Sequence, residues 1–385
     1  MIGFIVLMLG LTMARPIKRV LDEGVVLPIE SVDVHPIIRF QNWTPQRHSN
    51  FPQEELTMHL DSFCHRSGYY TAIHAEGNYP FRPVRLGITP LNDQLIRFEG
   101  VLSPVDPMTD EIAMNAMGLF CILSPSIPGD AFGNLLGRYR NKLLSLWFQN
   151  EDFQAGPAGE FGVGTINEQR IAEGPRTRFR LRSLAYNAVS MANSWVTPDT
   201  VEVRVGALVD EPCKIVFALE NAAIFVPKNI YEMVIRGLQG AKKTALDESL
   251  PFIPAPLVQE IDGFQKTSRM RRFDCQNAIL IPDMNIGELF IAKEMLYERV
   301  GNKCQLLIKP TIGQATHLRQ VYLGLKILRK FHVTVDFNVE GGEYVEFAPR
   351  ATSLATGYSS GASSSASSSR GGGASSSRDV ISNQL

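Results

Sequence analysis

The segment Arg-Thr-Arg-Phe-Arg-Leu-Arg at 176–182 is the part of the chain best suited to specific contact with a partner. Side chains alternate faces along a β-strand, so a strand here places four arginines on one face. Thr177, Phe179 and Leu181 then face a core. The arginines must meet water or an anion, because burying an unpaired charge is costly. Two interpretations stay open: a solvated edge strand protected from aggregation by its charges, or a contact with lipid headgroups or nucleic-acid phosphates.

Two further basic clusters could act together with this row of arginines. A Lys or Arg beside an anionic leaflet contributes roughly 1 kcal/mol, so several on one face could hold a protein on a membrane. The same side chains could instead bind RNA phosphates or form an ordinary solvated surface. The predicted contacts with anionic lipid or phosphate are Arg176, Arg178, Arg180, Arg182, Lys266, Arg269, Arg271, Arg272, Lys326, Arg329 and Lys330.

Motifs for catalysis are missing from the sequence. It contains no G-x-S-x-G, no H-E-x-x-H and no P-loop. Cys64-His65, with His74 further on, lacks the second ligand pair of a structural zinc site. We therefore expect no enzyme, no metal and no cofactor.

The five cysteines are scattered, and none forms a C-x-x-C pair. This pattern is typical of a reducing compartment rather than of a disulfide framework.

The first thirteen residues are almost wholly apolar, which is too few to cross a bilayer, since that takes about 20. The positive residues Arg15, Lys18 and Arg19 follow this run, whereas a signal peptide carries its charge in front. Thr12-x-Ala14 could still pass as a cleavage site. The interpretations, in order of preference, are a buried first strand or upstream extension, a membrane-surface anchor, and a signal peptide.

The elements that must position these residues are mostly short strands. Apolar runs of strand length, broken by Pro and Gly, fill 20–105, and Val201–Val205 alternates strictly. Helices are predicted over 109–122, 131–140, 183–193, 230–238 and 315–330, and strands over 278–281 and 332–339.

We therefore expect a mainly β protein with a few short helices (α+β), organised as two tandem β-sandwich-like domains and a disordered C-terminal tail. The length of 385 residues and the 44% hydrophobic content suit this organisation. The expected parts are an apolar segment 1–19, an N-terminal domain 20–239, a linker 240–256, a C-terminal domain 257–350 and a Ser/Gly tail 351–385.

Several short motifs share one family's order. Glu111–Phe120 followed by Ser124-Pro-Ser-Ile-Pro-Gly-Asp130 resembles a helix–turn–helix segment of matrix proteins of the paramyxovirus group. Ser183–Val189 resembles a short helix of that family, and Thr197-Pro-Asp199 falls at its turn. Phe225-Val-Pro-Lys228 with Tyr231 is similar to one of its strand ends.

The resemblance implies a dimer that tiles into a lattice under a lipid envelope and binds anionic lipid, nucleoprotein and glycoprotein tails. Met114 and Met117, in the helix predicted over 109–122, would contribute to self-association. The implied location is the virion, under the envelope, and the host cytoplasm and inner face of the plasma membrane. No PPxY or PTAP budding motif is present.

The sequence-based hypothesis is therefore a non-enzymatic viral matrix protein that assembles on an anionic membrane. The alternative is a viral coat or movement protein of β jelly-roll type that binds RNA.

Overall fold

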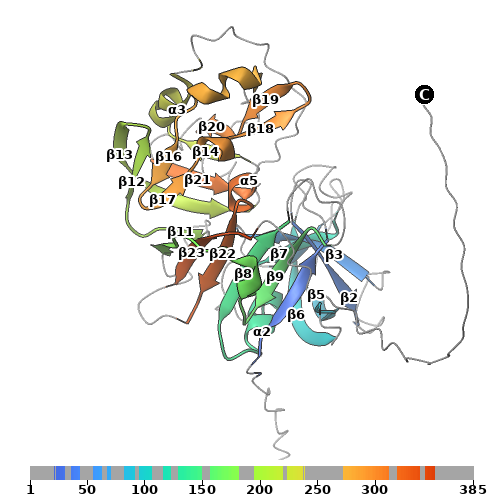
Figure 1. The fold of residues 1–385 in the computed structure, drawn as a ribbon. Coiled ribbons are helices and arrows are strands. Elements are labelled where there is room, and N and C mark those ends of the chain that lie inside the picture. Colours follow the sequence, from blue (N-terminus) through green and yellow to red (C-terminus); the bar gives the residue numbers. More distant parts are fainter. Residues whose placement is uncertain are drawn as a thin grey trace, which may run out of the picture. The chain divides into compact units, whose positions relative to one another are not determined.

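The computed structural model divides the chain into a compact unit, Met1–Thr352, and a C-terminal unit, Ser353–Leu385. It describes residues 21, 23–30, 36–43, 55–62, 67–70, 82–91, 95–105, 116–122, 129–149, 157–181, 195–219, 223–236, 238, 272–311, 319–338 and 343–351 (Figure 1). The expected tail 351–385 lies outside them apart from Ala351, as do the expected linker 240–256 and the apolar segment 1–19.

Strands dominate the described residues, and the helices are short, which confirms the expectation of a mainly β chain. The first strands are β1 (Val25–Ile29), β2 (Ile37–Asn42), β3 (Glu55–Asp61), β4 (Gly68–Tyr70), β5 (Arg82–Ile88), β6 (Ile96–Val105), β7 (Gly118–Cys121), β8 (Leu143–Phe148), β9 (Gly159–Val163), β10 (Thr177–Arg180) and β11 (Trp195–Val196). The later strands are β12 (Val201–Val205), β13 (Leu208–Ala218), β14 (Ile224–Val226), β15 (Arg272–Phe273), β16 (Met284–Ile286), β17 (Leu289–Ile291), β18 (Tyr297–Val300), β19 (Lys303–Leu306), β20 (Ile308–Pro310), β21 (Gln320–Gly324), β22 (Phe331–Asp336) and β23 (Tyr344–Pro349). The helices are α2 (Ala131–Leu136), α3 (Lys228–Ile235) and α5 (Leu325–Leu328), with 3-10 turns η1 (Glu168–Arg170), η3 (Cys275–Leu280) and η4 (Lys293–Met295).

Six strands of the N-terminal part close into a barrel in the order β2–β3–β7–β4–β6–β5. Phe40, Phe98 and Phe120 pack together inside it, with ring centroids 4.9–6.4 Å apart. Along β6 the residues alternate between buried and exposed, as expected for a strand with one face on a core. The barrel therefore has its own aromatic core.

Strands from both ends of the described chain form one six-stranded antiparallel sheet, in the order β1–β9–β8–β22–β23–β10. A second sheet has eight strands in the order β17–β16–β12–β13–β21–β14–β20, with β11 paired to β13 off this path. A third sheet has the order β15–β19–β18.

The sheets do not follow the expected boundary at 240–256. β10 pairs with β23, and β13 pairs with β21, so strands that precede 240 in the sequence share sheets with strands that follow 256. The two parts of the chain on either side of this segment are therefore joined by backbone hydrogen bonds.

Two predicted helices are wrong where the structure describes them. Gly118–Cys121, at the end of the helix predicted over 109–122, is strand β7. Residues 320–324, within the helix predicted over 315–330, form strand β21, and only Leu325–Leu328 are helical. Both strands are buried on both faces at nearly every position, and such runs are apolar throughout, so their periodicity does not separate strand from helix.

The helix predicted over 131–140 is present as α2, where the Asp130 carboxylate accepts a hydrogen bond from the Phe132 amide at 2.9 Å. The helix predicted over 230–238 begins earlier, as α3 after Pro227. Residues 278–280 of the strand predicted over 278–281 instead end η3, and Ile281 follows it. The helix predicted over 183–193 lies outside the described residues.

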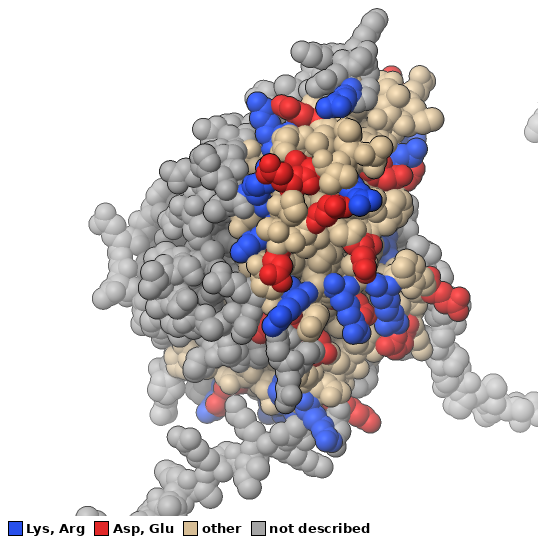
Figure 2. Space-filling view, turned by 90° about the vertical axis from the view of Figure 1, so that its left-hand side faces the viewer, with Lys and Arg blue, Asp and Glu red and all other residues tan. Residues whose placement is uncertain are grey.

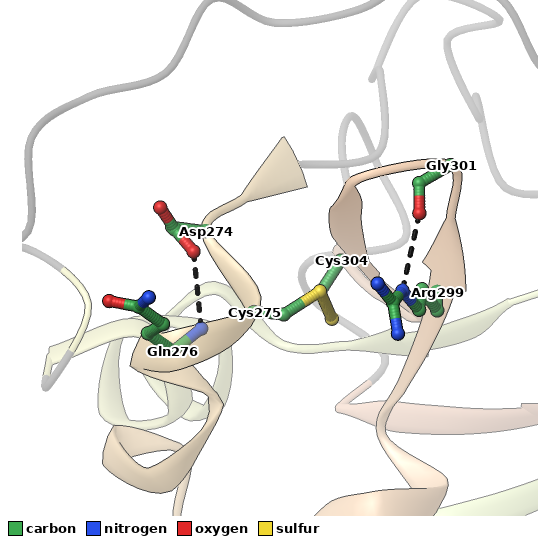
Figure 3. The surroundings of a disulfide bond; sticks show 6 residues. All are labelled: Asp274, Cys275, Gln276, Arg299, Gly301 and Cys304. Carbon is green, nitrogen blue, oxygen red and sulfur yellow. Dashed lines mark hydrogen bonds between the residues drawn. A yellow bond between two sulfur atoms is a disulfide. The ribbon is translucent and has the colours of Figure 1, made fainter.

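The expectation of reduced cysteines is also wrong. Cys275 of η3 and Cys304 of β19 form a disulfide, which Figure 3 shows between the two elements. Asp274 accepts a hydrogen bond from the Gln276 amide at 3.2 Å and so caps η3 beside the bond (Figure 3). Cys121 is disulfide-bonded as well, whereas Cys213 is a free, buried thiol.

Candidate functional site

The barrel and the eight-stranded sheet contain the same arrangement of four strands. In the barrel, β3 runs parallel to β7, β4 runs parallel to β6, and β4 runs antiparallel to β7. In the eight-stranded sheet, β13 runs parallel to β21, β14 runs parallel to β20, and β14 runs antiparallel to β21. β3, β4, β6 and β7 thus correspond in chain order to β13, β14, β20 and β21.

The six-stranded sheet has the symmetry that such a repeat predicts. Read inward from one edge its strands are β1, β9 and β8, and from the other edge they are β10, β23 and β22. β1 and β10 precede their four-strand sets, while β8–β9 and β22–β23 follow them after a short helix. Residues 25–163 and 177–349 are therefore two copies of one fold, related by an approximate twofold axis between β8 and β22.

Residue pairs along these strands fix which positions are equivalent. The last parallel pair of β3 and β7 is Asp61 with Cys121, and that of β13 and β21 is Ala218 with Gly324. Seven positions after Asp61, Gly68 pairs with Leu119 in antiparallel fashion. Seven positions after Ala218, Phe225 pairs with Tyr322 in the same way. The two registers agree, so Asp61 corresponds to Ala218 and Ser62 corresponds to Leu219.

Ser62 joins the two repeats at these equivalent positions. Its buried hydroxyl donates to the Phe217 carbonyl oxygen at 3.2 Å and accepts from the Leu219 amide at 2.9 Å. The hydrogen bonds reach the residues on both sides of Ala218. The Leu219 side chain has no polar group with which to return them, so among the described residues this side-chain link comes from the first repeat.

Asp61 lies half-buried at the end of β3, next to Ser62. Its negative charge adds to burial in raising the pKa of the nearby Tyr70 phenol. The Tyr70 hydroxyl lies 3.1 Å from Nδ1 of His59, and burial lowers the pKa of that histidine to about 4. At neutral pH this cluster therefore holds a neutral imidazole and a neutral phenol near Asp61.

The buried carboxylate of Asp130 links neighbouring strands of the barrel. Asp130 accepts hydrogen bonds from the Ser67 amide at 2.8 Å and from the Ser67 hydroxyl at 3.4 Å. The Ser67 hydroxyl in turn accepts from the Cys121 amide at 3.1 Å. Burial raises the pKa of Asp130 despite these donors. Asp130 thereby ties the start of α2 to the residue before β4 and to the end of β7.

The first copy therefore has a carboxylate, Asp61, at a position where the second copy has Ala218. Had both copies kept the aspartate, the junction would contain two carboxylates. Within the described residues, no group of three or more His, Cys, Asp or Glu side chains is placed to hold a metal ion.

The predicted arginine strand is present, with its side chains on the expected faces. Thr177 and Phe179 are buried, whereas Arg176, Arg178 and Arg180 are exposed; Arg182 lies outside the described residues. Arg178 lies 2.5 Å from Glu346 on the neighbouring strand β23, and Arg176 contacts Glu346 at 3.3 Å and Glu168 at 3.5 Å. The hydrogen bond to Glu346 raises the pKa of Arg178.

Glu346 and Glu168 therefore offset much of the positive charge of Arg176 and Arg178. Figure 2 shows the same mixture over the face it presents, where basic and acidic side chains alternate in place of one basic patch.

The other two basic clusters meet through polar side chains. Arg272 donates to the Gln305 side chain at 3.5 Å, Gln305 donates to Glu298 at 3.3 Å, and Lys326 pairs with Glu298. The structure thus brings Arg272 and Lys326 together. Arg329 and Lys330 are half-buried at the end of α5, and Lys266, Arg269 and Arg271 lie outside the described residues.

Of the residues predicted for self-association, Met114 lies outside the described residues. Met117 is half-buried and packs against the core. Its amide donates to the Thr57 carbonyl at 2.8 Å, and its carbonyl accepts from the Tyr70 amide at 2.8 Å. The contacts seen for Met117 are therefore internal to the barrel.

Sequence reasoning missed Asp61, Ser62, Ala218 and Leu219. The two copies place different residue types at equivalent positions, so the repeat has no sequence signal at this point. The one available signal was an Asp-Ser pair ending the alternating run Leu56–Leu60.

Neither a scan against protein-family models nor a search of curated proteins finds a match for this chain. Among the described residues, no helix is long and apolar enough to span a membrane.

Proposed function

We propose that this chain is a non-enzymatic binding protein whose junction between repeats keeps one half of a two-carboxylate site. The observation that carries the proposal is the residue at the position equivalent to Asp61, which is Ala218.

Two carboxylates close together can catalyse hydrolysis, as they do in aspartic proteases. Two like charges about 3 Å apart share a single proton, so that one group serves as acid and the other as base. Ala218 supplies no second carboxylate, so the two roles cannot be divided between the repeats. Asp61 keeps the capacity to accept hydrogen bonds from N–H or O–H donors of a bound partner.

A double-mutant cycle tests whether the two positions face each other. If the two positions face each other, the new carboxylate of Ala218→Asp lies beside Asp61, and like-charge repulsion lowers the free energy of unfolding at pH 7. Adding Asp61→Asn should recover about 0.5–3 kcal/mol of that loss, the range expected for residues in contact. Asp199→Asn, an exposed turn residue, serves as the control and should recover none.

Catalysis is tested on the unaltered protein. Incubated with an unfolded protein substrate between pH 3 and 6, it should release no fragments. Cleavage that Asp61→Asn abolishes would overturn the non-enzymatic proposal.

A second candidate is the matrix protein hypothesis, in which the chain assembles on an anionic membrane. It is favoured by β10, an edge strand on which the Arg178 side chain is 70% exposed despite its ion pair. Exposed pairs contribute little stability, so anionic headgroups could compete for these arginines.

Binding to phosphatidylserine liposomes at low salt tests this candidate. Binding should fall when Arg178→Glu and Arg180→Glu are combined. Arg204→Glu, which alters an exposed and paired arginine of β12, should leave it unchanged. Absence of liposome binding contradicts the candidate, and salt-sensitive retention of single-stranded RNA on filters would favour the RNA-binding alternative.

A further inference from the structure

The oxidised cysteines indicate where this chain folds. Cys275 is bonded to Cys304, and Cys121 is disulfide-bonded too. Disulfides persist in secreted proteins and in the lumen of the secretory pathway, whereas cytosolic thiols are kept reduced. A chain that matures in that lumen is exposed to the enzymes that modify asparagine side chains.

Asn42-Trp43-Thr44 is an Asn-x-Thr acceptor sequence with no proline at the middle position. Other asparagines of the chain, including the exposed Asn302, lack a Ser or Thr two positions later. The acceptor sequence and the disulfides are separate observations that point to the same compartment.

Asn42 occupies the last position of β2, where the barrel strand ends. It pairs with Leu86 of β5, and its side chain is half-buried. The next residue, Trp43, is 47% exposed and lies beneath the Arg97 guanidinium, 4.2 Å from the ring centroid. Asn42 is therefore half-buried at the end of a barrel strand, next to an exposed Trp43.

We infer that Asn42 carries an N-linked glycan. The donor is an oligosaccharide on a lipid diphosphate. The Asn42 amide nitrogen forms the bond to the anomeric carbon of the sugar, the bond from that carbon to the diphosphate oxygen breaks, and the amide loses one proton. Transfer takes place on the extended chain before β2 joins the barrel, so the half-burial of Asn42 in the fold does not block the reaction.

The test is to express the full chain in eukaryotic cells and treat the purified protein with a peptide N-glycosidase. The expected result is a gain in electrophoretic mobility and conversion of Asn42 to aspartate in the peptide mass spectrum. Thr44→Ala should abolish both effects while leaving Asn42 in place, whereas Thr44→Ser should retain them. Asn42→Gln should also abolish them.

An unmodified Asn42 peptide from the unaltered chain would overturn the inference. A mobility shift that persists in Thr44→Ala would overturn it as well, because the glycan would then lie elsewhere. A glycan on Asn42 would also place the protein on the opposite side of the membrane from a matrix lattice.

Discussion

Replacing Ser62 by alanine is the most direct test of the link between the two repeats. The change removes only an oxygen atom, so it leaves the backbone of β3 and the side-chain volume nearly intact. What it removes is the hydroxyl that binds the Phe217 carbonyl at 3.2 Å and the Leu219 amide at 2.9 Å.

The expected cost follows from the burial of all the groups involved. Ser62, Phe217 and Leu219 are fully buried, so water cannot replace the hydroxyl. A typical hydrogen bond contributes about 0.5–1.5 kcal/mol, and a buried donor or acceptor left without a partner costs about 1–3 kcal/mol. Ser62→Ala removes both bonds and leaves the buried Leu219 amide without this acceptor, so it should lower the free energy of unfolding by about 2–4 kcal/mol.

Urea unfolding, followed by tryptophan fluorescence, measures this difference. Ser103→Ala is the matched control, because the Ser103 hydroxyl is buried and has no hydrogen-bond partner among the described residues. Removing this hydroxyl should change the free energy of unfolding little or raise it, since no hydrogen bond is lost. The reasoning is refuted if Ser62→Ala costs no more than Ser103→Ala.

Three further outcomes are expected. Replacing Cys275 and Cys304 together by alanine should lower the free energy of unfolding by about 3–4 kcal/mol, the chain-entropy value for a loop of about 30 residues. In a urea titration, adding reductant to the unaltered protein should lower it by at least as much, because reductant also breaks the disulfide of Cys121. Burial lowers the pKa of His59 on folding from 6.5 to about 4, so the unfolded chain binds the extra proton and this group lowers the free energy of unfolding by roughly 3 kcal/mol as the pH falls from about 6.5 to about 4. Burial lowers the pKa of His332 to about 4 as well, so His59→Leu should reduce the pH dependence of unfolding over that window by about half of what the two histidines contribute. Glu160→Gln should cost about 3–5 kcal/mol at pH 7, because it strands the buried charge of Arg170; calorimetry that finds a loss below 1 kcal/mol would contradict this reading of the pair.

Features that depend on neighbours in sequence were predictable. The alternation of Arg178 and Phe179 indicated the two faces of β10, and the helix predicted over 131–140 begins where α2 begins. The mainly β character followed from many short apolar runs between Pro and Gly. In each case the physical cause is local, because side-chain direction and helix capping depend on adjacent residues.

Features that depend on distant partners were not predictable. β7 and β21 were read as helix because strands buried on both faces have no alternation to display. The disulfide between Cys275 and Cys304 was missed because their spacing resembles no known motif. Glu346 as the partner of Arg178 follows only from the pairing of β10 with β23, which lie more than 160 residues apart.

The sequence by itself determined the mainly β fold class, the faces of the alternating strands and the composition of the C-terminal tail. Tertiary structure alone decided which strands pair, that the chain contains two copies of one fold, and that Ser62 binds the residues around Ala218. The physical reason is that strand pairing is made by backbone hydrogen bonds, which are the same for every residue type. Local sequence patterns therefore do not indicate which distant strands pair. The repeat and its junction become visible only when the sheets are assembled.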